Sequence, residues 1–75
     1  MNVYYAQFGD SFDEGVVVVA AIDVLAAHEI VLSEMKEINP YAWRKFDPPT
    51  LVDFERLESV TATGEPRILT IFGKA

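Results

Sequence analysis

The chain has 75 residues and a formal net charge of −6, and 51% of its residues are hydrophobic while 24% are charged. This length accommodates a single domain spanning residues 1–75, and the composition excludes intrinsic disorder, which requires low hydrophobicity together with high net charge. The lack of cysteine excludes disulfides and thiolate metal ligands. A chain this small is therefore expected to gain further stability from self-association or from a partner.

Two strands are expected in the first third of the chain. Residues 2–8 are rich in Val, Tyr and Phe, and residues 16–22 form a run of β-branched and small apolar residues. The polar segment between Gly9 and Gly15 predicts a long hairpin loop. Because the valines at 16–19 show no polar alternation, they predict a central strand that is covered on both faces.

An amphipathic helix of about four turns is expected after Asp23, which is a good N-cap. The apolar residues that form its stripe are Val24, Leu25, Ala27, Val31, Leu32, Met35 and Ile38. The helix should end at Asn39-Pro40, because proline cannot continue the hydrogen-bond ladder.

The second half of the chain predicts a loop followed by two further strands. Residues 41–50 are the least regular, and residues 51–62 fit either a strand or a brief helix opened by Thr50, with a strand in 57–62. A turn at 63–66 precedes a final strand at 67–72. The order β-β-α-β-β predicts an α+β fold in which an antiparallel sheet of about four strands carries one helix on one face. The other face should be more polar or an interface.

The acidic residues are concentrated in the first half. Residues 1–35 contain six acids and no Lys or Arg, whereas residues 36–75 contain six acids and six bases. Because phosphate contacts require positive charge, direct binding of nucleic acid is disfavoured. The negative charge can instead meet a basic surface on another protein, or it can serve solubility alone.

The N-terminal sequence predicts neither a secretory signal nor a membrane span. Residues 1–8 carry no Lys or Arg, and Asp23 interrupts the apolar run that begins at Val16. We therefore expect a cytoplasmic protein.

The hairpin loop carries some of the acidic residues of a calcium loop, but it lacks two required ligands. Counted from Asp10, the third position is Phe12 and the twelfth is Ala21. We expect no metal site and no cofactor. The loop is then a solvated hairpin connection.

His28 is the only histidine, and it falls within the apolar stripe of the predicted helix. It should be at least partly buried, either at the edge of the core or at a pH-sensitive interface. A multi-histidine metal site is excluded, and Ser33 lies on the far side of the helix from His28. Enzyme activity is not expected; the enzymatic alternative pairs His28 with a carboxylate as acid and base.

Two segments are predicted to contact a protein partner. The first is the acidic loop, with Asp10, Phe12, Asp13 and Glu14, and the second is the aromatic-basic linker, with Tyr41, Trp43 and Arg44. Trp, Tyr and Arg are enriched at interaction hot spots. The linker residues also fit two other roles, closing one end of the core or stacking on single-stranded nucleic acid.

Together these features predict a small acidic, non-enzymatic protein-interaction module that docks to a protein partner or to itself as a homodimer. The alternative is an acidic inhibitor that imitates nucleic acid and occupies a basic groove on a partner protein. Binding by such an inhibitor should weaken steeply with salt, whereas docking through apolar contacts should not.

Overall fold

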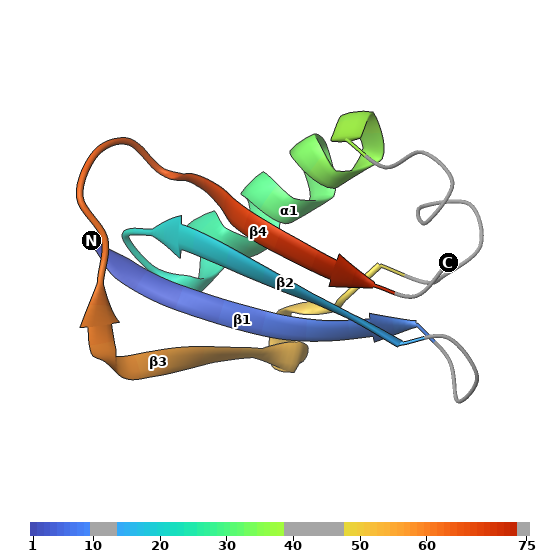
Figure 1. Cartoon of the computed structure of the whole chain (residues 1–75), viewed down its shortest axis with the longest axis horizontal. Helices are drawn as coiled ribbons and strands as arrows, with labels where there is room; N and C mark the ends of the chain where they lie inside the picture. The colour runs from blue at the N-terminus through green and yellow to red at the C-terminus, as the bar shows by residue number, and fades with distance from the viewer. Residues whose placement is uncertain (10–13, 39–47, 74–75) are drawn as a thin grey trace.

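The computed structural model describes residues 1–9, 14–38 and 48–73. Its elements in chain order are β1 (Asn2–Gly9), β2 (Glu14–Ala21), α1 (Val24–Ile38), the 3₁₀ helix η1 (Leu51–Asp53), β3 (Phe54–Thr61) and β4 (Arg67–Gly73). The strands form one antiparallel sheet in the order β3-β1-β2-β4, and in Figure 1 β2 and β4 pass in front of α1. The predicted α+β fold and its β-β-α-β-β order are confirmed.

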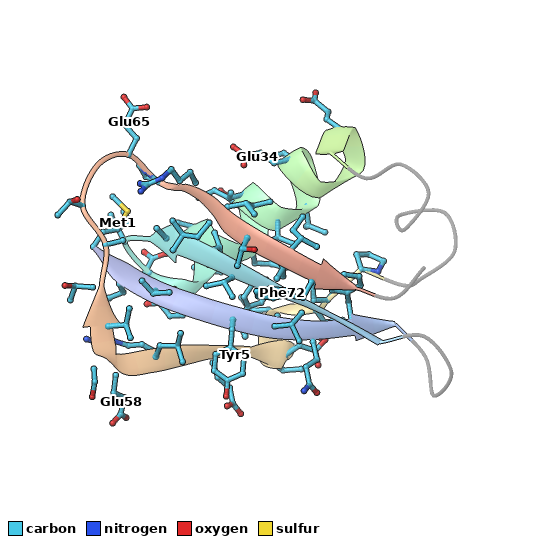
Figure 2. The ribbon with its side chains drawn as sticks, viewed as in Figure 1. Met1, Tyr5, Glu34, Glu58, Glu65 and Phe72 are labelled. Atoms are coloured by element: carbon cyan, nitrogen blue, oxygen red, sulfur yellow. The ribbon has the colours of Figure 1, made fainter. Side chains whose placement is uncertain are left out.

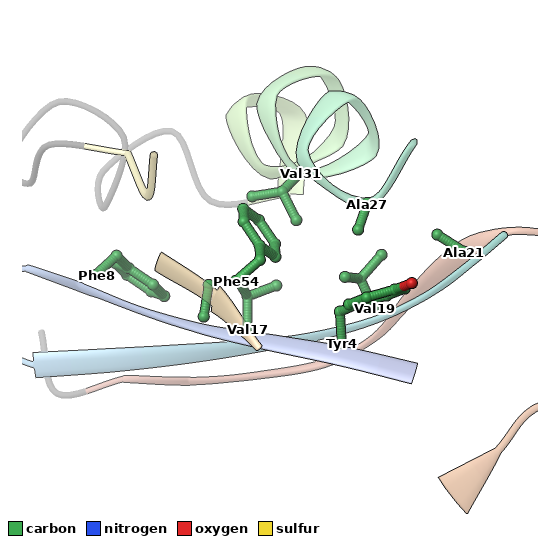
Figure 3. Packing of buried hydrophobic residues seen from close by; sticks show 9 residues of the cluster. Tyr4, Phe8, Val17, Val19, Ala21, Ala27, Val31 and Phe54 are labelled. Carbon is green, nitrogen blue, oxygen red and sulfur yellow. The ribbon is translucent and has the colours of Figure 1, made fainter. Parts of the chain in front are cut away.

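The core lies between α1 and one face of the sheet. Side chains alternate between the two faces of a strand, so every second residue of β1 and β2 reaches this core. The buried residues of these two strands that join the core are Tyr4, Ala6, Phe8, Val17, Val19 and Ala21. Figure 3 shows Ala27 and Val31 pointing from α1 toward them.

The helix begins where the sequence predicts it. The Asp23 carboxylate accepts a hydrogen bond from the backbone N–H of Ala26 at 2.8 Å, so Asp23 is the N-cap. Ala27 and Val31 are fully buried on the stripe. The assignment of Leu25 to that stripe is wrong, because Leu25 is 59% exposed. Two helical positions correspond to about 200° of rotation, which puts Leu25 on the side opposite Ala27.

Both alternatives for residues 51–62 are realised in succession. Thr50 donates from its backbone N–H and its hydroxyl to the Asp53 carboxylate, at 2.7 and 2.9 Å, and this pairing opens η1. The strand then begins at Phe54, three residues earlier than its expected start. Phe54 is buried in the core, where the His28 ring meets it edge-on at a centroid distance of 5.8 Å. His28 is half-buried, as expected.

The connection between β3 and β4 closes one end of the sheet. Met1 and Ala62 exchange two backbone hydrogen bonds of 3.1 and 2.9 Å. The Arg67 guanidinium donates to the carbonyl oxygens of Thr63 and Glu65 at 2.9 and 2.8 Å. Gly64, with a φ of 90°, supplies the left-handed backbone of this turn.

β4 contains an irregularity at Leu69. Ile68 lies opposite Val19 and Thr70 opposite Val18, so Leu69 has no partner residue on β2. This is the arrangement of a β-bulge, which bends an edge strand locally.

No helix in the described part of the chain is long and apolar enough to cross a membrane.

Candidate docking site on the open face of the sheet

The two faces of β2 differ sharply in burial. Val17 and Val19 are fully buried under α1, whereas Val16 and Val18 on the other face are only half-buried. β2 is a central strand, as the sequence predicts, and its face away from α1 is only partly covered at Val16 and Val18. The single described α-helix lies over one face, and within the described residues no second α-helix lies over Val16 and Val18.

Strand register arranges the uncovered side chains in two rows, because residues paired across strands share a face. In one row Tyr5 lies between Glu55 on β3 and Val18 on β2, and Val18 is followed by Thr70 on β4. In the other row Val16 lies between Gln7 and Phe72. We call the surface formed by Tyr5, Gln7, Val16, Val18, Thr70 and Phe72 the open face.

Phe72 is the most prominent apolar side chain of the open face. It is 63% exposed, although it stands within β4 and opposite Val16. Tyr5 lies toward β3 and Phe72 toward β4 (Figure 2). The open face therefore presents an aromatic ring on each side of two valines.

The open face occupies only one end of the sheet. At the other end Val3 and Ala20 are 1% and 0% exposed, although they also belong to the face away from α1. Arg67 pairs with Ala20 there and is bound to the β3–β4 connection. The uncovered half is thus the one nearer to Gly9 and Gly73.

A shallow hollow adjoins the open face on the β3 side. Its volume is about 360 Å³, and it is lined by Tyr5, Gln7, Val52, Asp53 and Glu55. The Tyr5 hydroxyl donates a hydrogen bond to the Glu55 carboxylate. This bond and the negative charge of Glu55 raise the pKa of Tyr5 above its ordinary value. We call this feature the acidic hollow.

The described arginines do not lie in the acidic hollow. Arg56 pairs with Tyr4, whose side chain is in the core, so Arg56 belongs to the helix side of the sheet. Arg67 donates to backbone carbonyl oxygens at the closed end. Among the described residues, the charged side chains that line this edge of the open face are the carboxylates of Asp53 and Glu55.

The seven predicted contact residues fall in segments that the structure describes only in part. Those outside the described residues are Asp10, Phe12, Asp13, Tyr41, Trp43 and Arg44, and Glu14 is described only as the first residue of β2. The ends of these segments can be located. The acidic loop leaves the sheet between Gly9 and Glu14, beside the uncovered half. The aromatic-basic linker precedes η1, which contributes Val52 and Asp53 to the acidic hollow.

Sequence reasoning missed the residues that make up the open face. Phe72 and Val16 were assigned to strands, but their shared face depends on a register that the sequence does not specify. The described residues contain no group of three or more His, Asp or Glu side chains that could hold a metal ion.

Comparison with family models, curated proteins and solved structures found no match to the chain. The function of the open face must therefore be inferred from its own chemistry.

Proposed function

We propose that this protein is a non-enzymatic interaction module of the cytoplasm that docks to a protein partner, or to a second copy of itself, through the open face. The observation that supports this most directly is the 63% exposure of Phe72 in a row with Val16 and Gln7. An exposed aromatic side chain beside partly exposed valines is typical of the anchoring contacts at interaction surfaces.

The acidic loop and the aromatic-basic linker fit the same role. The acidic loop joins the described chain beside the open face, at Gly9 and Glu14. The aromatic-basic linker runs from the end of α1, on the other side of the sheet, to η1, which lines the acidic hollow. We propose that Asp10, Phe12, Asp13 and Glu14, together with Tyr41, Trp43 and Arg44, extend the docking surface beyond the sheet.

The position of His28 also favours a binding role over catalysis. Its ring packs against Phe54 on the helix side of the sheet. Asp53 and Glu55 line a hollow that adjoins the opposite face. An acid–base pair needs both groups within reach of one substrate, so this separation disfavours the pairing of His28 with Asp53 or Glu55.

The proposal can be tested by comparing Phe72→Thr with Leu25→Gln. Threonine keeps the strand propensity of position 72, and Leu25, 59% exposed on α1, is a matched apolar control away from the open face. A partner that co-purifies with the wild-type chain should bind Phe72→Thr at least about tenfold more weakly, as expected for a lost aromatic hot spot. Leu25→Gln should bind like wild type. Equal affinity of all three chains would contradict docking through the open face.

A second candidate is the acidic inhibitor that imitates nucleic acid. The observation in its favour is that carboxylates also project from other surfaces, since Glu29 and Glu37 on α1 and Glu58 on β3 are exposed. This function predicts that affinity for the partner falls steeply between 50 and about 500 mM salt. An affinity that is nearly independent of salt would reject it in favour of apolar docking.

A further inference from the structure

We infer that the open face takes a polypeptide segment that is both apolar and basic, with its apolar side chains over Val16, Val18 and Phe72 and a Lys or Arg in the acidic hollow. This inference rests on the proposed docking function and specifies the chemistry of the partner. The open face and the acidic hollow share Tyr5 and Gln7, so they form one continuous surface.

The apolar part of this surface lies away from its charges. The row of Gln7, Val16 and Phe72 contains no charged residue, and the row of Tyr5, Val18 and Thr70 reaches a charge only at Glu55 on β3. Phe72 stands on β4, at the opposite edge of the sheet. Three inter-strand spacings separate these edges, about 14 Å, which an extended chain of about four residues spans.

The acidic hollow is suited to a cationic side chain. Its volume of about 360 Å³ is at the lower end of the range for ligand sites. The Tyr5 hydroxyl donates to one oxygen of Glu55, and a carboxylate can accept further hydrogen bonds from a guanidinium or ammonium group. Asp53 adds a second negative charge, and the Tyr5 ring provides an aromatic surface nearby.

Neither described arginine supplies a positive charge to the acidic hollow. Arg56 is on the helix side of the sheet and Arg67 is bound to the carbonyl oxygens of Thr63 and Glu65. A stacked second copy would bring its own Asp53 and Glu55 rather than a matching described base.

A capped pentapeptide, acetyl-Ile-Thr-Val-Thr-Arg-amide, provides a test, because it places an apolar anchor four residues from an arginine. The control peptide carries citrulline, which has nearly the same shape as arginine and no charge. Amide chemical shifts of the full chain, titrated at low salt, should move at Tyr5, Gln7 and Phe72. The arginine peptide should bind at least about fivefold more tightly than the citrulline peptide.

Two variants on β3 separate the acidic hollow from general negative charge. Glu55→Gln should abolish the preference for arginine, whereas Glu58→Gln, which removes an exposed carboxylate outside the hollow, should preserve it. Equal affinity for the two peptides, equal effects of the two variants, or no binding of the arginine peptide at millimolar concentration would overturn the inference.

Two further outcomes distinguish this inference from the proposed function. In the first outcome, the arginine and citrulline peptides bind with equal affinity, and Phe72→Thr weakens the binding of both to the same extent. Docking through the open face then stands, and the basic partner is rejected. If sedimentation shows a dimer that Phe72→Thr dissociates, the open face belongs to a second copy and the basic segment is rejected.

Discussion

The two faces of one sheet carry similar side chains and have different surroundings. On β2, Val17 and Val19 are fully buried beneath α1, whereas Val16 and Val18, their direct neighbours in sequence, are half-buried on the open face. The same residue type is thus core on one side and surface on the other. A valine of β2 is fully buried where another element covers its face of the sheet. The described part of the chain contains one α-helix, which covers one of the two faces.

The largest expected difference in the free energy of unfolding is between truncations of one phenylalanine on each face of the sheet. Phe54→Ala removes a ring that is 7% exposed in the core and should lower the free energy of unfolding by about 3 kcal/mol or more. Phe72→Ala truncates a ring that is 63% exposed and should cost less than about 1 kcal/mol. Urea denaturation followed by circular dichroism measures both.

Val31→Ala keeps this comparison measurable if Phe54→Ala does not fold. Val31 is fully buried on α1, and its truncation should cost about 2 kcal/mol through lost burial and the resulting cavity. Comparable losses for Phe72→Ala and the two core variants would show that the open face is as well packed as the core and would contradict the difference in burial between the two faces.

Gly15→Ala should produce the next largest effect. Gly15 lies opposite Phe8, and a Cβ atom at position 15 would come within 2.3 Å of the Phe8 ring. Because Phe8 is buried, its ring has little room to move, and overpacking of this kind typically costs about 1–3 kcal/mol. Val16→Ala, on the open face, should cost less than Gly15→Ala in the same urea experiment. The reverse order would contradict the close contact of Phe8 with β2.

The N-cap of α1 offers a smaller and more local test. Asp23→Ala removes the carboxylate that accepts from the N–H of Ala26, which should lower the free energy of unfolding by about 1 kcal/mol. Asp23→Asn should retain most of this stability, since its side-chain oxygen can accept the same bond. Thermal unfolding under matched conditions measures both variants. If the cap made no contribution, Asp23→Ala and Asp23→Asn would have the same stability.

The smallest effect concerns the titration of Tyr5 at the edge of the open face. Its pKa is raised by the hydrogen bond to Glu55 and by the charge of Glu55. Because the folded state holds the proton more tightly than the unfolded state, this contribution to stability is present below pH 10 and is lost as the pH rises through the raised pKa. Glu55→Gln should lower the pKa of Tyr5 toward its ordinary value, as followed by ultraviolet absorbance of tyrosinate. An unchanged pKa in Glu55→Gln would show that Glu55 is not its cause.

Local patterns were sufficient to predict the element order and the fold class. The stripe that includes Ala27 and Val31 predicted α1, and the capping chemistry of Asp23 predicted its start. The error at Leu25 arose because an apolar residue next to the stripe was counted as part of it. The partial coverage of β2 could not be predicted, because an unbroken apolar run indicates a central strand but does not reveal whether a second layer covers it.

The open face could not be predicted because it depends on long-range register. Tyr5 and Glu55 are fifty positions apart, and they meet only because β3 pairs with β1 in one particular alignment. Phe72 likewise joins Val16 through the register of β4, which the bulge at Leu69 shifts by one residue. A one-residue slip would turn Phe72 toward the core, so no local pattern could assign it to the open face.

The most direct test of docking through the open face is site-specific photo-crosslinking of the full chain in its native host. The photoreactive residue p-benzoylphenylalanine would replace Phe72 on the open face or Leu25 on the outer side of α1, two exposed positions. We predict a discrete covalent adduct with a partner from position 72 and none from position 25. Adducts formed from position 25 alone would contradict docking through the open face.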